Sequence, residues 1–284
     1  MDRSLLLSLA WRPQLNWRLV GGGTAIAMLF IIALAAPLFA PFDPLEQDLI
    51  AQFAPPDPFA AGGHALGTDS LGRDVLSRLI YGTRVAFTVA LVAGTVTALV
   101  GTVLGLAAGF FGGWWDRVIM RLVDVWTSFP PVLLSVILVA FLGTGLHSVI
   151  IAIVVIDWTR FCRVIRAETM KQRSMDYLDA AVVAGRTRLA IVAYEILPNV
   201  LPLLLVLLTL EMGIAVIVEA ILSFVGLSVS TDFPTWGGMI AEGRQVIYQA
   251  PWIMVFPMLA ILVTVLGFNL LGDGLKTALD PVLR

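Results

Sequence analysis

Charged side chains are scarce in this chain. Only 13% of its 284 residues are Asp, Glu, Lys or Arg, whereas 59% are hydrophobic, and the formal net charge is −2. A soluble globular protein carries about 25% charged residues, so this chain has too few polar side chains to cover a water-exposed surface. The composition also excludes a disordered chain, and the small net charge excludes a general attraction to nucleic acid. The sequence therefore indicates a membrane protein.

Cysteine, histidine and lysine are scarcer still. The single cysteine, Cys162, has no partner for an intrachain disulfide, and the two histidines, His64 and His147, are far apart, so we expect no metal site. The two lysines, Lys171 and Lys276, do not belong to a G-x-x-x-x-G-K-[ST] loop, so the sequence contains no P-loop for ATP. It contains no G-x-S-x-G or H-E-x-x-H motif either. These absences predict a protein that is not an enzyme.

Long apolar runs, by contrast, recur along the chain. A transmembrane helix needs about 20 apolar residues, and charge-free runs cover residues 19–42, 85–115, 125–156 and 245–272. The third run is too long for one helix, and Gly143-Thr144-Gly145 offers a natural break; a further apolar stretch begins at Pro198. The sequence predicts an all-α integral membrane fold with six transmembrane helices, at about residues 19–41, 85–111, 118–142, 146–166, 198–225 and 250–272.

The second predicted helix is rich in glycine. Gly94, Gly101, Gly105 and Gly109 follow one another at short spacings. Small residues spaced in this way form a face on which another helix packs closely. We therefore expect this helix to pack against other helices and not only against lipid.

Positive charge is sorted between the two sides that these helices define. With a cytoplasmic N-terminus, 14 of the 18 lysines and arginines fall on the cytoplasmic side and four fall outside. Cytoplasmic loops carry the excess of Lys and Arg, so we expect both termini in the cytoplasm. On this reading Arg160, Arg163 and Arg166 anchor the cytoplasmic end of the fourth helix.

The connection between the fourth and fifth helices, about residues 168–197, is the most polar part of the chain. It contains the sequence YLDAAVVAG from Tyr177 to Gly185 and closes with Ile196-Leu197-Pro198. This pattern predicts a short helix at about 175–184, a turn at the glycine and a second helix that continues into the fifth span. Two interpretations remain open on the pattern alone: an ordinary amphipathic connection, or a surface on which another protein docks.

This segment resembles the EAA signature of permease subunits of bacterial ABC importers. That signature runs Glu-Ala-Ala, three residues, Gly, and then about ten residues to Ile-Leu-Pro; here Asp179 takes the place of the glutamate. The resemblance implies that the segment is the helix through which the permease couples to its ATPase. The coupling residues that it implies are Tyr177, Asp179, Ala180, Ala181, Gly185 and Pro198.

Further strings along the chain are similar to the C-type permeases of dipeptide, oligopeptide and nickel importers. They occur in order and at matching membrane positions: Leu66–Leu79, Asp116–Arg121, Ser223–Leu227, Pro234–Gly237, Phe268–Asp273 and Leu279–Pro281. The resemblance implies an N-terminal part at 1–83 with the first helix and a periplasmic loop. It also implies an ABC type-1 transmembrane domain at 84–273 and a cytoplasmic tail at 274–284.

Much of the expected biology is carried by this resemblance. It implies the type I ABC importer fold in the bacterial inner membrane, with this chain as one half of a transmembrane pair. The implied partners are a B-type permease, two ATPase subunits that hold ATP and Mg²⁺, and a periplasmic substrate-binding protein. No cofactor is expected on this chain itself, and nucleic acid is not an expected partner.

Two acids fall well inside the fifth apolar span. A charge at mid-bilayer costs about 2.5–3.5 kcal/mol, so Glu211 should face protein or water. It either lines the translocation path, where it senses a cationic or amine-bearing solute, or it is a packing residue between helices. Glu219 lies eight residues on, which places it about 80° further around the helix. It is a second candidate for the path, but a structural role is favoured.

The external stretch before the second helix contains Arg73, Asp74 and Arg78. These residues are either part of a solvated interfacial helix or a docking surface for the binding protein or the second permease.

Three functions remain open at this stage. The leading hypothesis is a permease subunit that imports peptides or a similar small solute. A nickel importer permease is the alternative within the same class. A stand-alone ion-coupled carrier is the rival from another class, and such a carrier would not need the segment from Asp179 to Gly185.

Overall fold

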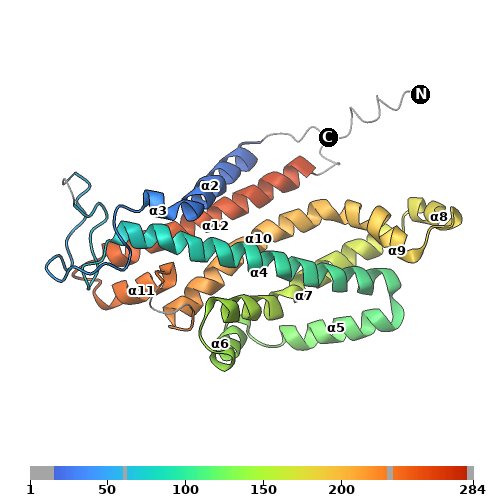
Figure 1. Cartoon of the computed structure of the whole chain (residues 1–284). Coiled ribbons are helices and arrows are strands. Elements are labelled where there is room, and N and C mark those ends of the chain that lie inside the picture. The colour runs from blue at the N-terminus through green and yellow to red at the C-terminus, as the bar shows by residue number, and fades with distance from the viewer. Residues whose placement is uncertain (1–15, 60–62, 229–232, 280–284) are drawn as a thin grey trace.

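Helices dominate the computed structural model, which describes residues 16–59, 63–228 and 233–279. Within those residues the pairing of extended backbone is limited to an isolated β-bridge between Thr68 and Asp74. Figure 1 shows an elongated bundle of long helices that run side by side. The helices are α2 (Trp17–Leu34), α3 (Ala36–Phe39), α4 (Val75–Phe111), α5 (Gly113–Thr127), α6 (Pro131–Leu142), α7 (Leu146–Arg173), α8 (Asp176–Val183), α9 (Arg188–Ile191), the π-helical turn η1 (Val192–Ile196), α10 (Leu197–Phe224), α11 (Trp236–Gln245) and α12 (Trp252–Leu279).

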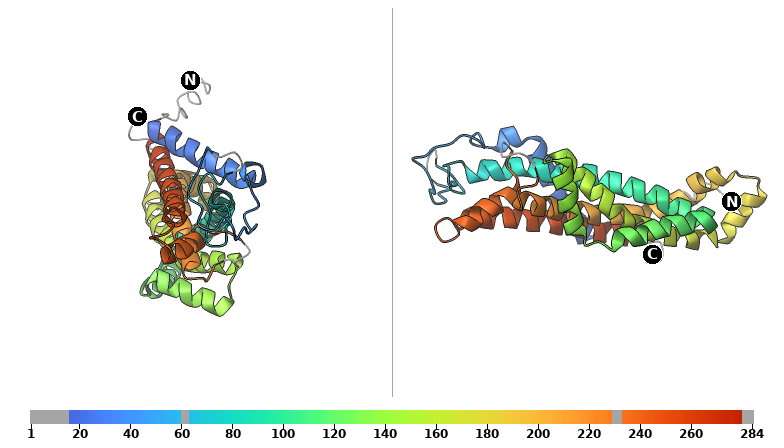
Figure 2. Two further views of the ribbon diagram at one scale, coloured as in Figure 1. Left: turned by 90° about the vertical axis from the view of Figure 1, so that its left-hand side faces the viewer. Right: turned by 90° about the horizontal axis from the view of Figure 1, so that it is seen from below.

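The two ends of the bundle differ in character. The irregular segment 40–74 and α11 lie at one end, and α8 and α9 project at the other, as both views of Figure 2 show. We call these the loop end and the α8 end. The parts predicted at residues 1–15 and 280–284 lie outside the described residues, as does most of the string Leu279–Pro281.

Four helices of the described chain are long and apolar enough to cross a membrane: α2, α4, the continuous stretch Arg188–Phe224, and α12. The pair α5 and α6 adds a fifth if it is counted as one broken span. The all-α membrane fold is therefore confirmed, but length and composition support fewer than the six spans predicted. The remaining predicted helix is α7, which is 28 residues long but too polar to qualify because its charged residues extend to its midpoint.

The prediction of one continuous helix over 118–142 is wrong. The chain bends by 88° between α5 and α6. Pro130 and Pro131 lie at this break, with Pro131 in the first turn of α6. Because proline lacks an N–H and disfavours helical backbone in the residue before it, the second helix starts anew instead of continuing the first.

The first and second helices also differ from their predicted bounds. The helix expected over 19–41 ends at Leu34 and resumes as the short α3 beyond Ala35. The helix expected from residue 85 already begins at Val75, where the Asp74 side chain accepts a hydrogen bond of 2.7 Å from the Ser77 N–H. The charge-based prediction missed this first part because Arg78 and Arg84 interrupt the apolar run.

The expected close packing of the glycine face of α4 is confirmed. A Cβ on Gly105 would lie 2.8 Å from the carbonyl oxygen of Cys162, and one on Gly109 would lie 2.8 Å from that of Arg166. Both carbonyls belong to α7, so the two backbones approach as closely as glycine allows. This contact fixes α7 along α4, while α10 packs against both α4 and α12.

Candidate functional site

An ion pair joins α7 to α10 halfway along both helices. The Arg160 guanidinium donates a hydrogen bond of 3.2 Å from Nη1 to Oε2 of Glu211. The Glu211 side chain is 1% exposed, whereas that of Arg160 is 49% exposed. A buried carboxylate is tolerated where it is paired with a cation, and Arg160 supplies that cation.

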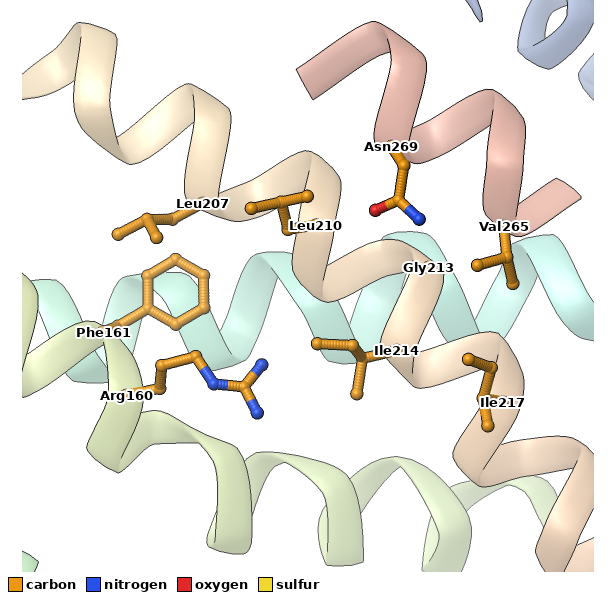
Figure 3. Close-up of a pocket in the computed structure, with 9 residues that line it drawn as sticks. All are labelled: Arg160, Phe161, Leu207, Leu210, Gly213, Ile214, Ile217, Val265 and Asn269. Carbon is orange, nitrogen blue, oxygen red and sulfur yellow. The ribbon is translucent and has the colours of Figure 1, made fainter. Parts of the chain in front are cut away.

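The arginine borders a cavity of about 250 Å³ between α7, α10 and α12, drawn in Figure 3. Its polar lining consists of Arg160 from α7 and Asn269 from α12, and the rest of the wall is apolar. Gly213 leaves part of the wall without a side chain. The complete lining is Arg160, Phe161, Leu207, Leu210, Gly213, Ile214, Ile217, Val265 and Asn269.

The position of Arg160 corrects the sequence interpretation. Arg160 was expected at the cytoplasmic end of the fourth helix as an anchor, but it lies at the middle of the 28-residue α7. Arg163 and Arg166 follow on that helix and pair with Asp124 and Asp116 of α5. The signal that could have found the pair was Glu211 itself, because an acid in an apolar helix needs a cation of matching depth.

Glu219 has a different environment. It is 1% exposed, and its Oε1 accepts hydrogen bonds from the hydroxyls of Ser223 at 2.6 Å and Ser228 at 3.1 Å. It does not line the cavity described above. These two hydroxyls tie the end of α10 to the segment that follows it, which supports the structural role favoured for this residue.

The expected docking residues at the loop end are buried within the chain. Arg73, Asp74 and Arg78 are at most 8% exposed. Both arginines bind Asp69 and reach Glu242 of α11, at 3.1 Å from Arg73 and 2.6 Å from Arg78. The Asp74 carboxylate caps α4 and accepts from His64 at 3.0 Å.

The expectation of a solvated interfacial helix or an exposed docking surface at these three residues is therefore wrong. They form an internal network that holds the segment 40–74 against α4 and α11. Charged groups at such burial are stabilised by being paired, and it is the partner on α11, far away in sequence, that a local pattern does not reveal.

The predicted coupling segment projects from the α8 end. Helix α8 ends in a Schellman motif, in which the Gly185 N–H bonds to the Val182 carbonyl and the Arg186 N–H bonds to the Ala181 carbonyl. Gly185 has a φ of 76°, a conformation that residues with a Cβ adopt only with strain. The turn reverses the chain, and an ion pair of 2.5 Å between Arg186 and Glu195 joins its two arms.

The residues of this segment divide into an inner and an outer face. Ala181 is buried, in a cluster with Leu178 and Ile196, while Asp179 and Ala180 are exposed. The Tyr177 hydroxyl donates to Gln172 at 2.8 Å and accepts from Asn199 at 3.4 Å, which links α8 to the beginning of α10. Burial in this corner raises the pKa of the Tyr177 hydroxyl. Pro198 lies in the first turn of α10 and is exposed.

The outer face also carries apolar side chains that the sequence analysis did not single out. They are more than half exposed in this chain: Val182, Val183, Leu189 and Tyr194. Apolar side chains gathered at a tip are typical of a protein-interaction surface.

Comparison with known proteins decides the family. A model of the binding-protein-dependent transport system inner membrane component matches residues 101–284. The chain belongs to this family. As a family member it is a permease subunit of an ABC importer, a multi-pass protein of the inner membrane, and not an enzyme, because the ATPase is a separate subunit. A stand-alone ion-coupled carrier is thereby excluded.

Curated members of the family match nearly the whole chain. The glutathione transport system permease protein GsiD of Pectobacterium atrosepticum is 37% identical over 96% of this chain and 90% of its own length. The dipeptide transport system permease protein DppC of Haemophilus influenzae is 39% identical over 92% and 91%, respectively. The di/tripeptide permease DppC of Pseudomonas aeruginosa is 40% identical over 93% and 88%.

The fold is also that of a solved transporter. A chain of the MetNI methionine ABC transporter in an inward-facing conformation superposes with a TM-score of 0.60 at 20% identity, over 72% of this chain and 97% of that chain. At this identity the match establishes the type I fold of this permease subunit and nothing about its solute.

Proposed function

We propose that this chain forms one half of a translocation path for short peptides, with dipeptides, tripeptides and glutathione as the solute class. The observation that supports this class is the set of family members named above, which are 37–40% identical over at least 92% of this chain and are named for these solutes. The nickel alternative has no such support among them.

The partners follow the same reasoning. A B-type permease would supply the other half of the path, and a periplasmic binding protein would deliver the peptide. ATP and Mg²⁺ would stay on two ATPase subunits, with no cofactor on this chain. The supporting observation is the exposed apolar tip at α8 and α9, with Val183 88% exposed, because such a surface gains stability when a partner covers it.

The orientation is part of the proposal. The α8 end would face the cytoplasm, together with both termini, and the segment 40–74 would face the periplasm. The supporting observation is the concentration of Lys and Arg between residues 160 and 188, which the positive-inside rule assigns to the cytoplasmic side.

Peptide uptake and co-purification test this function. Deletion of the gene should abolish uptake of labelled dipeptide or glutathione, and a plasmid copy should restore a vanadate-sensitive uptake. A tagged chain should co-purify with a second permease and ATPase subunits. Loss of nickel uptake with unchanged peptide uptake would overturn the solute class, and peptide uptake by the chain alone in proteoliposomes would overturn the mechanism.

A further inference from the structure

The chemistry at the surface of the α7–α10–α12 cavity differs from that of the acid behind it. Arg160 and Asn269 reach the cavity, whereas Glu211 is buried and is not part of the lining. Figure 3 shows the guanidinium and the amide directed into the space between the three helices. A solute in the cavity therefore contacts a cation and an amide before it contacts any carboxylate.

Both polar groups keep hydrogen-bonding capacity free. Glu211 occupies one N–H of Arg160, at 3.2 Å, out of the five that a guanidinium carries. The Asn269 side chain makes no hydrogen bond with another residue in the described part of the chain. Arginine with two free N–H groups on one edge binds a carboxylate through two parallel hydrogen bonds.

We propose that this cavity binds the free α-carboxylate of the transported peptide during translocation, with Arg160 as the direct ligand and Asn269 as a second contact. The inference rests on the proposed function, since it takes a peptide as the solute. It changes the role considered for Glu211, because an amine-bearing solute would have to displace Arg160 before it reached that acid.

The size of the cavity fits the end of a peptide. At about 250 Å³ it is smaller than the 300–1,000 Å³ that is typical of pockets for whole small-molecule ligands. The walls formed by Leu210, Ile214, Ile217 and Val265 offer apolar contacts without directional hydrogen bonds. Such walls accept varied side chains at the C-terminal residue while the carboxylate fixes its orientation.

The charges around Arg160 are compatible with this assignment. Asp157 lies one turn earlier on α7 and acts electrostatically on Glu211. Neither acid lines the cavity, so their charge is presented to a solute from behind the guanidinium. Arg163, one turn further along α7, is directed to Asp124 of α5 and serves as a matched control because its side chain is also 49% exposed.

Charged thiol reagents test the cavity in the whole complex without any need for transport. The complex is placed in nanodiscs with Ile214→Cys in a Cys162→Ala background. The reaction rates with an anionic sulfonatoethyl and a cationic trimethylammonium-ethyl methanethiosulfonate are then measured in the resting and vanadate-trapped states. Arg160→Gln should lower the ratio of anionic to cationic rate by about tenfold, as expected for loss of one nearby charge. Arg163→Gln should leave the ratio unchanged.

Protection by peptides tests the carboxylate. A dipeptide should slow the labelling of the cysteine, and the same dipeptide with a C-terminal amide should not. Equal protection by both peptides, an unaltered rate ratio in Arg160→Gln, or a cysteine that neither reagent reaches in either state would overturn the inference.

The outcomes separate this inference from the proposed function. If the wild-type complex imports dipeptide but the free and amidated peptides protect equally, the carboxylate site alone fails. If the wild-type complex imports no peptide, the proposed function fails and the inference fails with it.

Discussion

Arg160 and Glu211 pair across the bundle at the midpoints of two 28-residue helices, with a single hydrogen bond of 3.2 Å between them. The acid is buried and the base is half exposed. One partner therefore remains accessible to a solute, while the other compensates its charge inside the protein. This asymmetry distinguishes the pair from the external ion pairs of the chain.

The first prediction concerns the energetic coupling of this pair. Glu211→Gln and Arg160→Gln should each lower the stability of the complex, and the double variant should lose less than the sum of the two. A coupling energy of about 1 kcal/mol is expected, since half of the pair is solvated. Thermal or denaturant unfolding of the purified complex measures it. Strict additivity would show that the two side chains do not interact.

The second prediction uses two adjacent glycines of α2. A Cβ on Gly22 would lie 2.5 Å from the Leu271 backbone N of α12, whereas one on Gly23 would meet only the end of the Leu271 side chain at 3.9 Å. Gly22→Ala should destabilise the protein by about 1–3 kcal/mol through overpacking, and Gly23→Ala should be close to neutral. Melting temperatures of the two variants decide the matter, and equal values would contradict this packing of α2 on α12.

The third prediction concerns the buried network at the loop end. Arg78→Gln leaves Asp69 and part of Glu242 without their shared cation, which should cost about 3 kcal/mol. Arg84→Gln removes an exposed arginine one and a half turns further along α4 and should cost less than about 0.5 kcal/mol. Expression level and thermal stability of the two variants provide the comparison. A stable Arg78→Gln protein would show that the network is dispensable.

The fourth prediction concerns the exposed tip. Val183→Asp should weaken association with the ATPase subunits at least tenfold without lowering the stability of the permease, because the side chain is exposed in the isolated chain. Ile50→Asp, an equally exposed residue at the loop end, should leave the association unchanged. Co-purification of the ATPase from membranes measures both. An ATPase that is retained in Val183→Asp and lost in Ile50→Asp would place the docking surface at the opposite end.

Local patterns predicted most of the helical content, and they failed at identifiable residues. The glycine spacing of α4 predicted its close packing because a missing Cβ has the same consequence wherever the partner lies. The bend between α5 and α6 was missed although Pro130 and Pro131 are visible in the sequence, because charge-free length was given more weight than proline. The early start of α4 was missed because Arg78 counted as a solvated charge. The division into 1–83, 84–273 and 274–284 stays a prediction.

The sequence by itself determined that the protein lies in a membrane, that it has no P-loop, and that a polar segment ending at Ile196-Leu197-Pro198 stands between two apolar stretches. Composition and local motifs suffice for these conclusions because they depend on the solvent and on neighbouring residues. Only the tertiary structure decided that Arg160 pairs with Glu211, that Asn269 lies beside them, and that Arg73 and Arg78 are directed inward to Glu242. These relationships join residues that are between 51 and 169 positions apart, and the depth and rotation of packed helices, which no local pattern records, bring them together.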